Sequence, residues 1–252
     1  MTVALRVRAL RQGYERHLVL TGLDFALRAG VTGLLGPNGA GKSTLLRTLA
    51  TVTPPRAGEV TVAGRVIRTD RGARRARELI GYLPQQATPT GSFTVFDAVR
   101  YSAWLRRVPD RQADGATRQA IAAVGLADRS GSRVSALSGG MRQRCRLAQS
   151  IVGGPRILLL DEPTVGLDPA QRLEFRELVR AFVADDPTRA VLISTHLIED
   201  IAALCQRVVV VCGGAIAFDG SPADMGGLGG DGPGDSAHER GYLRVLRGAS
   251  AR

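Results

Sequence analysis

The sequence predicts an α/β fold in which a mainly parallel sheet carries a phosphate-binding loop. Residues 31–35 are a short apolar run typical of a buried strand, and residues 45–49 open a helix. Between them the chain matches the pattern G-x-x-x-x-G-K-S/T, whose backbone amides and following helix N-terminus bind phosphate. The loop consists of Gly36, Pro37, Asn38, Gly39, Ala40, Gly41, Lys42, Ser43 and Thr44.

Lys42 strengthens this interpretation because it is the only lysine in the chain. Every other basic residue is an arginine or one of three histidines. A compact ammonium suits a place between two phosphates, where a planar guanidinium is a poor replacement. In this pattern Lys42 reaches the terminal phosphates and the Ser43 hydroxyl is a ligand of Mg²⁺. A chance glycine turn before a helix is the weaker interpretation.

Composition limits the other classes of function. With 252 residues and 44% hydrophobic content, the chain suits one α/β domain with an inserted lobe. Three cysteines without C-x-x-C spacing indicate free thiols in a reducing compartment. The longest apolar run, residues 208–218, is too short to span a bilayer, and residues 1–6 do not resemble a signal peptide.

The net charge of +11 leaves several partners open. Residues 65–77 are the densest basic stretch, and no aromatic residues interleave with it, so we expect no nucleic acid partner. We favour a solvated face over contact with anionic lipid headgroups for this stretch.

The first third of the chain reads as strands. Residues 3–10 and 18–27 alternate in character as half-buried strands do, and residues 59–64 and 79–84 add two more. Tyr14 stands in the first turn, where its ring either stacks on a purine base or is simply half-buried. Spacing alone does not decide between these two readings.

The middle of the chain changes character. Residues 94–136 show helical periodicity without a strand signal, which predicts a helical lobe inserted into the α/β chain. Residues 137–141 follow it, with Ser138 as an N-cap before Gly139 and Gly140. Alone, a serine and two glycines at a helix start indicate either an anion-binding terminus or only a capped helix.

A buried strand, residues 157–162, ends in two adjacent acids, Asp161 and Glu162. The carboxyl ends of parallel strands are where doubly wound folds place their ligands. We therefore expect Asp161 to face a metal ion and Glu162 to face the attacking water. A second buried strand, residues 190–195, ends at His196, which is either a phosphate donor or a loop residue.

The remaining features are weaker. Asp168 stands before Pro169 and is a plausible helix N-cap. Residues 207–219 form a hairpin-like pair of strands, and residues 226–235 are rich in glycine. We expect one main domain over residues 1–225 and a glycine-rich linker and tail over residues 226–252. Residues 242–246 are an apolar patch that either docks back or mediates a contact.

Taken in order, these motifs resemble the ATP-binding subunit of ATP-binding cassette transporters over roughly residues 3–222. The resemblance is carried by Tyr14, residues 36–44, Gln85, residues 137–141, residues 157–162, residues 166–168 and His196. The unbroken turn at residues 166–169 and the continuation of residues 194–200 are most similar to bacterial export-type cassettes.

The resemblance implies a P-loop NTPase core with a mainly parallel sheet, an N-terminal antiparallel β subdomain and an inserted helical subdomain. It also implies ATP and Mg²⁺ as ligands and a head-to-tail dimer with two ATP molecules between subunits. One subunit would supply Tyr14 for the adenine, residues 36–44 for the phosphates, and Ser43, Gln85 and Asp161 for Mg²⁺. Lys42, Gln85, Glu162 as general base and His196 at the γ-phosphate would form its catalytic set.

The opposite subunit would supply Ser138, Gly139 and Gly140, and Asp168 would lie at the dimer seam. The resemblance further implies separate transmembrane permease subunits, which residues 86–96 would contact. The location would be peripheral, on the cytoplasmic face of the membrane. Two alternatives stay open: a soluble non-transport ATPase of this type, and a nucleotide-binding regulatory module without hydrolysis. The transported substrate does not follow from the sequence.

Overall fold

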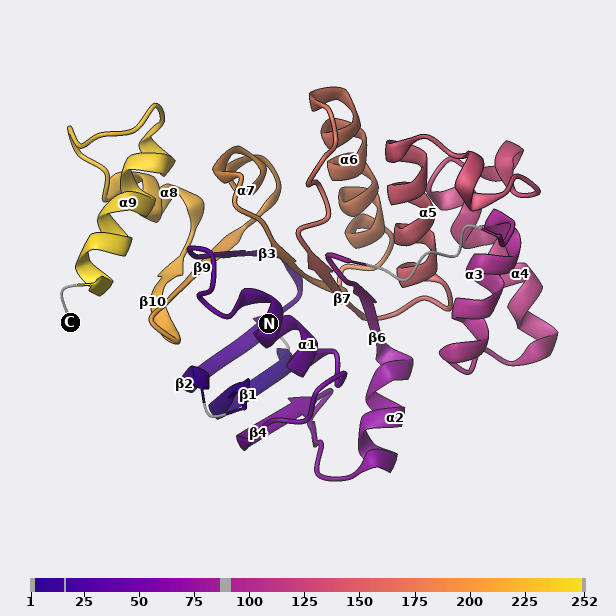
Figure 1. Cartoon of the computed structure of the whole chain (residues 1–252), viewed down its shortest axis with the longest axis horizontal. Helices are drawn as coiled ribbons and strands as arrows, with labels where there is room; N and C mark the ends of the chain where they lie inside the picture. The colour runs from indigo at the N-terminus through magenta and orange to yellow at the C-terminus, as the bar shows by residue number, and fades with distance from the viewer. Residues whose placement is uncertain (1–2, 16, 87–91, 251–252) are drawn as a thin grey trace.

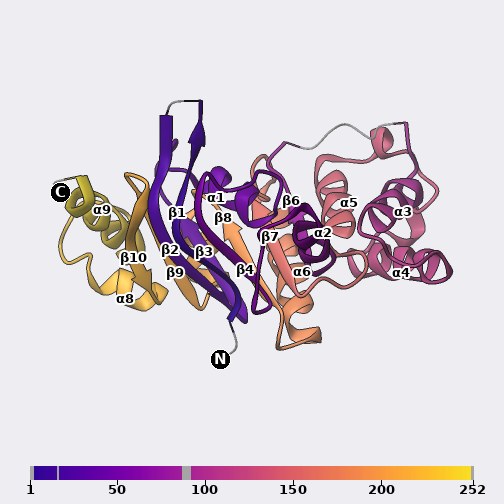
Figure 2. The ribbon, with the colours of Figure 1, turned by 90° about the horizontal axis from the view of Figure 1, so that it is seen from below.

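The computed structural model describes residues 3–15, 17–86 and 92–250, which fold into two sheets with a helical lobe beside them. The four-stranded sheet has the order β2-β1-β4-β5, and the six-stranded sheet has the order β10-β9-β3-β8-β7-β6. Figures 1 and 2 agree in placing the helical lobe (α3, α4 and α5) at one end and the C-terminal helices at the other.

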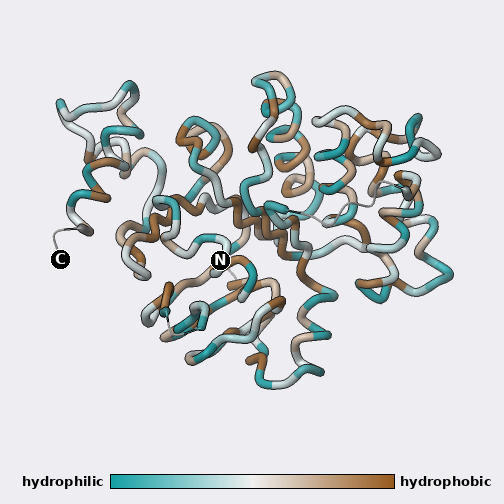
Figure 3. The backbone as a smooth tube through the Cα atoms, viewed as in Figure 1, coloured by the Kyte–Doolittle hydropathy of each residue, from teal (hydrophilic) through white to brown (hydrophobic). Residues whose placement is uncertain are grey.

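Five strands of the six-stranded sheet are parallel. Strand β3 pairs with β8 and β9, and β7 pairs with β6 and β8. Their side chains are buried on both faces, as in a sheet covered on both sides, and Figure 3 shows this part of the chain as its most hydrophobic. The bounds are β3 Gly30–Leu35, β6 Ile80–Leu83, β7 Ile157–Asp161, β8 Ala190–Ser194, β9 Arg207–Cys212 and β10 Ala215–Gly220. Strand β10 is antiparallel to β9.

The four-stranded sheet is antiparallel and is formed almost entirely by the N-terminal quarter of the chain. Its inward side chains, among them Leu5, Val7 and Leu10, share a buried cluster with helix α1 (Lys42–Leu49) and with one face of the larger sheet. The strands are β1 Val3–Tyr14, β2 His17–Arg28, β4 Ala57–Val62 and β5 Arg65–Val66. The predicted fold class, including the N-terminal antiparallel subdomain, is therefore confirmed.

Three helices of the lobe and core begin directly after a residue whose side chain caps them. Thr94 and Asp97 form a reciprocal capping box at α3, and Ser138 and Asp168 cap α5 and α6. The helices are α2 Asp70–Leu79, α3 Val95–Leu105, α4 Asp110–Ala123, α5 Gly139–Ile151, α6 Pro169–Asp185, α7 Ile198–Leu204, α8 Pro222–Gly227 and α9 Ala237–Ser250. Short 3₁₀ turns, Ala127–Arg129 and Val134–Ala136, complete the lobe. Within the described part of the chain, no helix has the length and apolar character that a membrane crossing requires.

The C-terminal segment packs against the core. Tyr242 and Val245 of α9 pack against the large buried cluster. Gly241 lies so close to α8 that a Cβ on it would be 1.8 Å from the carbonyl oxygen of Met225. Of the two readings of residues 242–246, the structure thus shows docking. The boundary expected at residue 225 falls within α8 and stays a prediction.

Candidate functional site

The phosphate-binding loop links β3 to α1, as the sequence predicts. Gly41 has φ +99°, and a Cβ there would lie 2.7 Å from a methyl carbon of Leu20. A Cβ on Gly36 would lie 2.3 Å from the carbonyl oxygen of Val211 on the neighbouring strand β9. Only glycine fits both positions, and α1 starts directly after Gly41 with its N-terminal amides free of a side-chain cap.

Lys42 crosses back over this loop. Its ammonium donates to the carbonyl oxygens of Gly36 at 2.7 Å and Pro37 at 3.2 Å, and the side chain is nearly buried. Burial lowers the pKa of Lys42, while the charges of Glu162 and Asp161 act in the opposite direction. The loop therefore holds a desolvated cation beside its glycine backbone, which suits a polyphosphate.

Asp161 ends β7 and is buried. Its Oδ1 accepts hydrogen bonds from Ser194 Oγ at 2.8 Å and Ser43 Oγ at 3.0 Å. Its Oδ2 is buried and has no hydrogen-bond partner among the described residues. Burial raises the pKa of Asp161, and the bonds from Ser194 and Ser43 partly offset that rise.

This arrangement fits Mg²⁺. The orphaned Asp161 oxygen and the Ser43 hydroxyl are the hard oxygen donors that this ion prefers. In the described part of the chain no three His, Cys, Asp or Glu side chains gather as a metal cluster. Mg²⁺ is commonly held by one or two protein groups together with substrate phosphates.

Glu162 and His196 meet at the edge of the sheet. Glu162 Oε2 lies 2.8 Å from His196 Nδ1, with the carboxylate nearly buried and the imidazole 56% exposed. The Glu162 backbone has φ +50°, which is uncommon for a residue other than glycine, and its amide donates to the carbonyl and hydroxyl oxygens of Ser194. Ser194 of the neighbouring strand β8 thus holds the backbone of Glu162 in place.

A cleft of about 440 Å³ brings these groups together with residues distant in sequence. Tyr14 lies at this cleft and is 53% exposed. Its hydroxyl lies 3.2 Å from Thr44 Oγ1 and accepts a hydrogen bond from Arg47. An exposed ring leaves both readings of Tyr14 open. The lining consists of Tyr14, His17, Val19, Asn38, Gly39, Ala40, Gly41, Lys42, Ser43, Thr44, Gln85 and Glu162.

His17 is a lining residue that the sequence interpretation missed. It pairs with Tyr14 across the turn between β1 and β2. Its position three residues after Tyr14, in a two-stranded hairpin, is the signal that could have found it.

The residues expected to come from the opposite subunit or to lie at the dimer seam are outside this cleft. They are Ser138, Gly139, Gly140 and Asp168. Ser138 Oγ accepts from the amide of Met141, and Asp168 Oδ1 accepts from the amide of Gln171, so both are N-caps. A Cβ on Gly140 would lie 2.8 Å from the Gln171 side chain, which places the starts of α5 and α6 side by side. Neither Ser138, Gly139, Gly140 nor Asp168 lines the cleft that holds residues 38–44.

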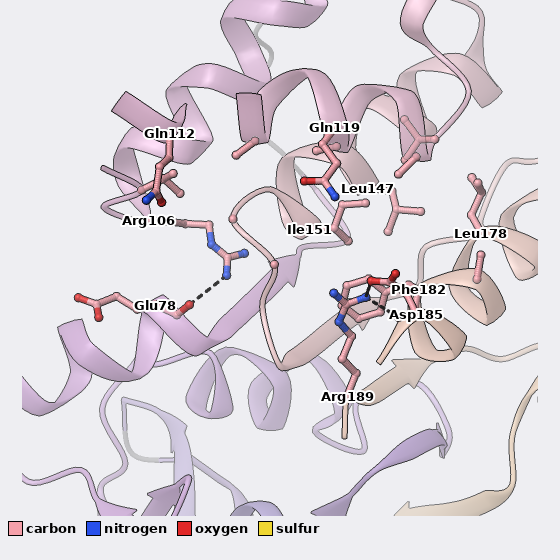
Figure 4. Close-up of a pocket in the computed structure, with 18 of the residues that line it drawn as sticks. Glu78, Arg106, Gln112, Gln119, Leu147, Ile151, Leu178, Phe182, Asp185 and Arg189 are labelled. Carbon is pink, nitrogen blue, oxygen red and sulfur yellow. Dashed lines mark hydrogen bonds and ion pairs between the residues drawn. The ribbon is translucent and has the colours of Figure 1, made fainter. Parts of the chain in front are cut away.

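A larger cavity, about 750 Å³, contains none of the predicted site residues. It lies between α4, α5 and the end of α6, and Figure 4 shows Arg106, Phe182 and Arg189 around it. The Arg106 guanidinium donates to the carbonyls of Ser150 and Glu78, and burial lowers its pKa to about 10. Size alone therefore does not mark the functional cleft.

The fold and the phosphate loop define a P-loop nucleotide-binding protein. Residues 20–165 match the family model described as ABC transporter, and the chain belongs to this family of ATP-binding proteins. It is 37% identical over 222 residues to the Nod factor export ATP-binding protein I of Rhizobium meliloti (strain 1021), covering 88% of this chain and 65% of that protein. It is 29% identical over 229 residues to the linearmycin resistance ATP-binding protein LnrL of Bacillus subtilis (strain 168), covering 90% and 72%.

Solved structures agree. One described as the ATP-binding subunit of an ABC transporter superposes with a TM-score of 0.81 at 25% identity, covering 97% of this chain and 99% of that one. A second, cbiO1 from Clostridium perfringens, described as part of the ABC transporter complex cbiONQ, gives 0.78 at 27% identity, covering 89% and 91%. The resemblance stated from the sequence is thus confirmed. The chain spans about two thirds of the length of the Rhizobium relative.

Proposed function

We propose that this chain hydrolyses ATP with Mg²⁺ and drives export of a substrate through separate membrane subunits. One observation carries the proposal: the phosphate loop, the Asp161–Ser43 pair and the Glu162–His196 pair lie together at the carboxyl ends of adjacent parallel strands. Phosphoryl transfer needs positioning and charge neutralisation more than covalent chemistry, and these groups supply both.

The contacts within the cleft support a role for each group. Lys42 and the backbone amides of the loop bind the phosphates. Ser43, Asp161 and Gln85 would hold Mg²⁺, which when bound would neutralise charge on the phosphate oxygens. Glu162 accepts a proton from the attacking water. His196, which contacts that carboxylate, orients it and reaches the γ-phosphate.

The same proposal makes the cleft one half of a site. Ser138, Gly139 and Gly140 lie apart from the cleft of their own chain, which supports their supply by a second copy or a homologous partner in a head-to-tail dimer. Asp168 then lies at the seam, and a monomer binds ATP but hydrolyses it poorly. Tyr14 stacks on the adenine at the open end of the cleft.

The membrane partners are inferred from the family. The relatives carry the names of a Nod factor exporter and of a resistance protein, and cbiO1 is part of a transporter complex. We assign residues 1–225 to the ATPase domain, with 94–136 as its helical subdomain, and place the protein at the cytoplasmic face of the membrane. Of the permease-contacting loop at residues 86–96, residues 87–91 lie outside those the structure describes.

Two measurements test this function. Purified protein should hydrolyse ATP only when Mg²⁺ is present, and affinity purification from its native cells should recover a polytopic membrane protein. Hydrolysis by the purified protein, combined with an affinity purification that recovers no membrane protein, would point to the non-transport ATPase. Binding of ATP with no turnover under either condition would point to the regulatory module.

Asp161→Asn is expected to remove the advantage that Mg²⁺ gives to ATP binding. The substitution keeps the size of the side chain and an oxygen for the two serines but removes the charge that faces the ion. Because a hydrogen bond or contact to a charged group is worth about 1.5–3 kcal/mol, the affinity for Mg·ATP should fall by at least about tenfold.

The measurement is the dissociation constant of ATP with Mg²⁺ and with EDTA. Asp110→Asn, at an exposed carboxylate on α4, is the matched control and should leave both values unchanged. An Asp161→Asn variant that binds Mg·ATP as tightly as the wild type would remove Asp161 from the metal site.

A further inference from the structure

A buried carboxylate outside the cleft joins the segments that carry the site. Asp200 lies on α7, four residues after His196, and is only 4% exposed. Its Oδ2 accepts a hydrogen bond of 3.0 Å from the hydroxyl of Thr164, which is also buried. Its Oδ1 faces Arg176 Nη1 at 3.4 Å.

These partners come from three different segments. Thr164 lies in the turn that follows β7, two residues after Glu162. Arg176 belongs to α6, the helix capped by Asp168. Asp200 itself belongs to the helix that follows His196. The Asp200 carboxylate therefore links the segments that directly follow Glu162, His196 and Asp168.

The direct contact between Glu162 and His196 needs such support. The imidazole is more than half exposed, so its contact with the carboxylate competes with water. The positive φ of Glu162 is a sparsely populated conformation that persists only when surrounding groups hold it. Ser194 holds the Glu162 amide from one side, and Thr164 fixes the turn on the other.

The energetics favour positioning over simple stabilisation. Burying a carboxylate and a guanidinium costs hydration of both, so a buried ion pair is weak evidence for added stability. The Thr164 hydroxyl and Arg176 together satisfy both Asp200 oxygens, while Arg176 Nε has no partner among the described residues.

We propose that Asp200 is a positioning residue for hydrolysis: through the buried Thr164 hydroxyl, it keeps the turn after Glu162 in register with the helix after His196. The inference rests on the hydrolytic function proposed above. Asp200 does not line the cleft and acts on the reaction only through Glu162 and His196.

The test substitution is Thr164→Val, which removes the hydroxyl and leaves the Asp200–Arg176 pair in place. From the usual strength of one hydrogen bond to a charged group, kcat should fall by about 10- to 100-fold with KM for ATP nearly unchanged. Thr164→Ser keeps the hydroxyl and should restore a kcat close to that of the wild type. Thr117→Val is the matched control, because Thr117 is also buried and its hydroxyl has no partner among the described residues.

A double-mutant cycle separates positioning from mere stability. In a Glu162→Gln background, Thr164→Val should cause no further loss of the residual turnover, because the group that it positions is already gone. A further loss of equal size in that background, a wild-type kcat for Thr164→Val, or a Thr164→Ser variant as slow as Thr164→Val would overturn the proposal. The wild-type rate in the same assay shows separately whether the chain hydrolyses ATP at all.

Discussion

Glu162→Gln is expected to lower steady-state ATP turnover by about 10²–10⁴-fold while leaving ATP binding intact, because this is the usual contribution of a positioned general base. The glutamine keeps the shape of the side chain and can still contact His196, but it cannot accept a proton from water. The nearly buried carboxylate at 2.8 Å from the imidazole is the only feature that the substitution changes chemically. Turnover is measured by phosphate release and binding by titration with ATP.

Glu174→Gln on the exposed face of α6 is the matched control and should hydrolyse ATP at the wild-type rate. If Glu162→Gln also kept that rate, the general base would have to be another group in the cleft. If it lost ATP binding as well, the carboxylate would belong to the binding of the phosphates or the metal.

Lys42→Arg is expected to weaken ATP binding by about 10- to 100-fold even though it keeps the positive charge, since charged hydrogen bonds to the ligand are lost. The ammonium occupies a narrow, nearly buried position against the carbonyls of Gly36 and Pro37. A guanidinium is planar and broader, and its fixed donor fork does not fit there. The use of arginine everywhere else in the chain indicates that this position alone cannot take it.

Lys42→Ala gives the effect of removing the charge completely and should be at least as severe. The control is Arg74→Lys, which makes the reverse exchange on the exposed face of α2, outside the cleft. This variant should bind ATP as tightly as the wild type. If Lys42→Arg bound ATP as tightly as the wild type, the argument from the lone lysine would fail.

The elements with a strong local signal were predictable. The buried strands β3, β7 and β8 are short apolar runs, and the hairpin of β9 and β10 surrounds Gly213 and Gly214 as expected. The helix α2 was missed because a helical stripe needs apolar residues, and Ala76 is the only buried residue of this helix. Its arginines therefore read as a basic stretch without secondary structure.

The candidate site also contains residues that the sequence predicts and residues that it does not. Residues 36–44, Asp161 and Glu162 could be predicted because each belongs to a short contiguous motif whose residue types indicate its chemistry. Thr164 and Asp200 could not, because their importance depends on which distant segments the topology brings together. Sequence order also cannot tell whether the start of α5 serves its own cleft or that of another subunit. The position of Ser138 outside the cleft makes that question testable.

Mixing two inactive variants tests most directly whether the site is shared between subunits. Ser138→Arg blocks the start of α5 (residues 138–140) in one subunit, and Lys42→Ala disables the phosphate loop of the other. In a head-to-tail dimer, each mixed pair keeps one composite site with both wild-type residues, so random mixing should recover up to about a quarter of the wild-type ATPase rate. An equimolar mixture that stays as inactive as either variant alone, although the two proteins form mixed dimers, would contradict the shared site.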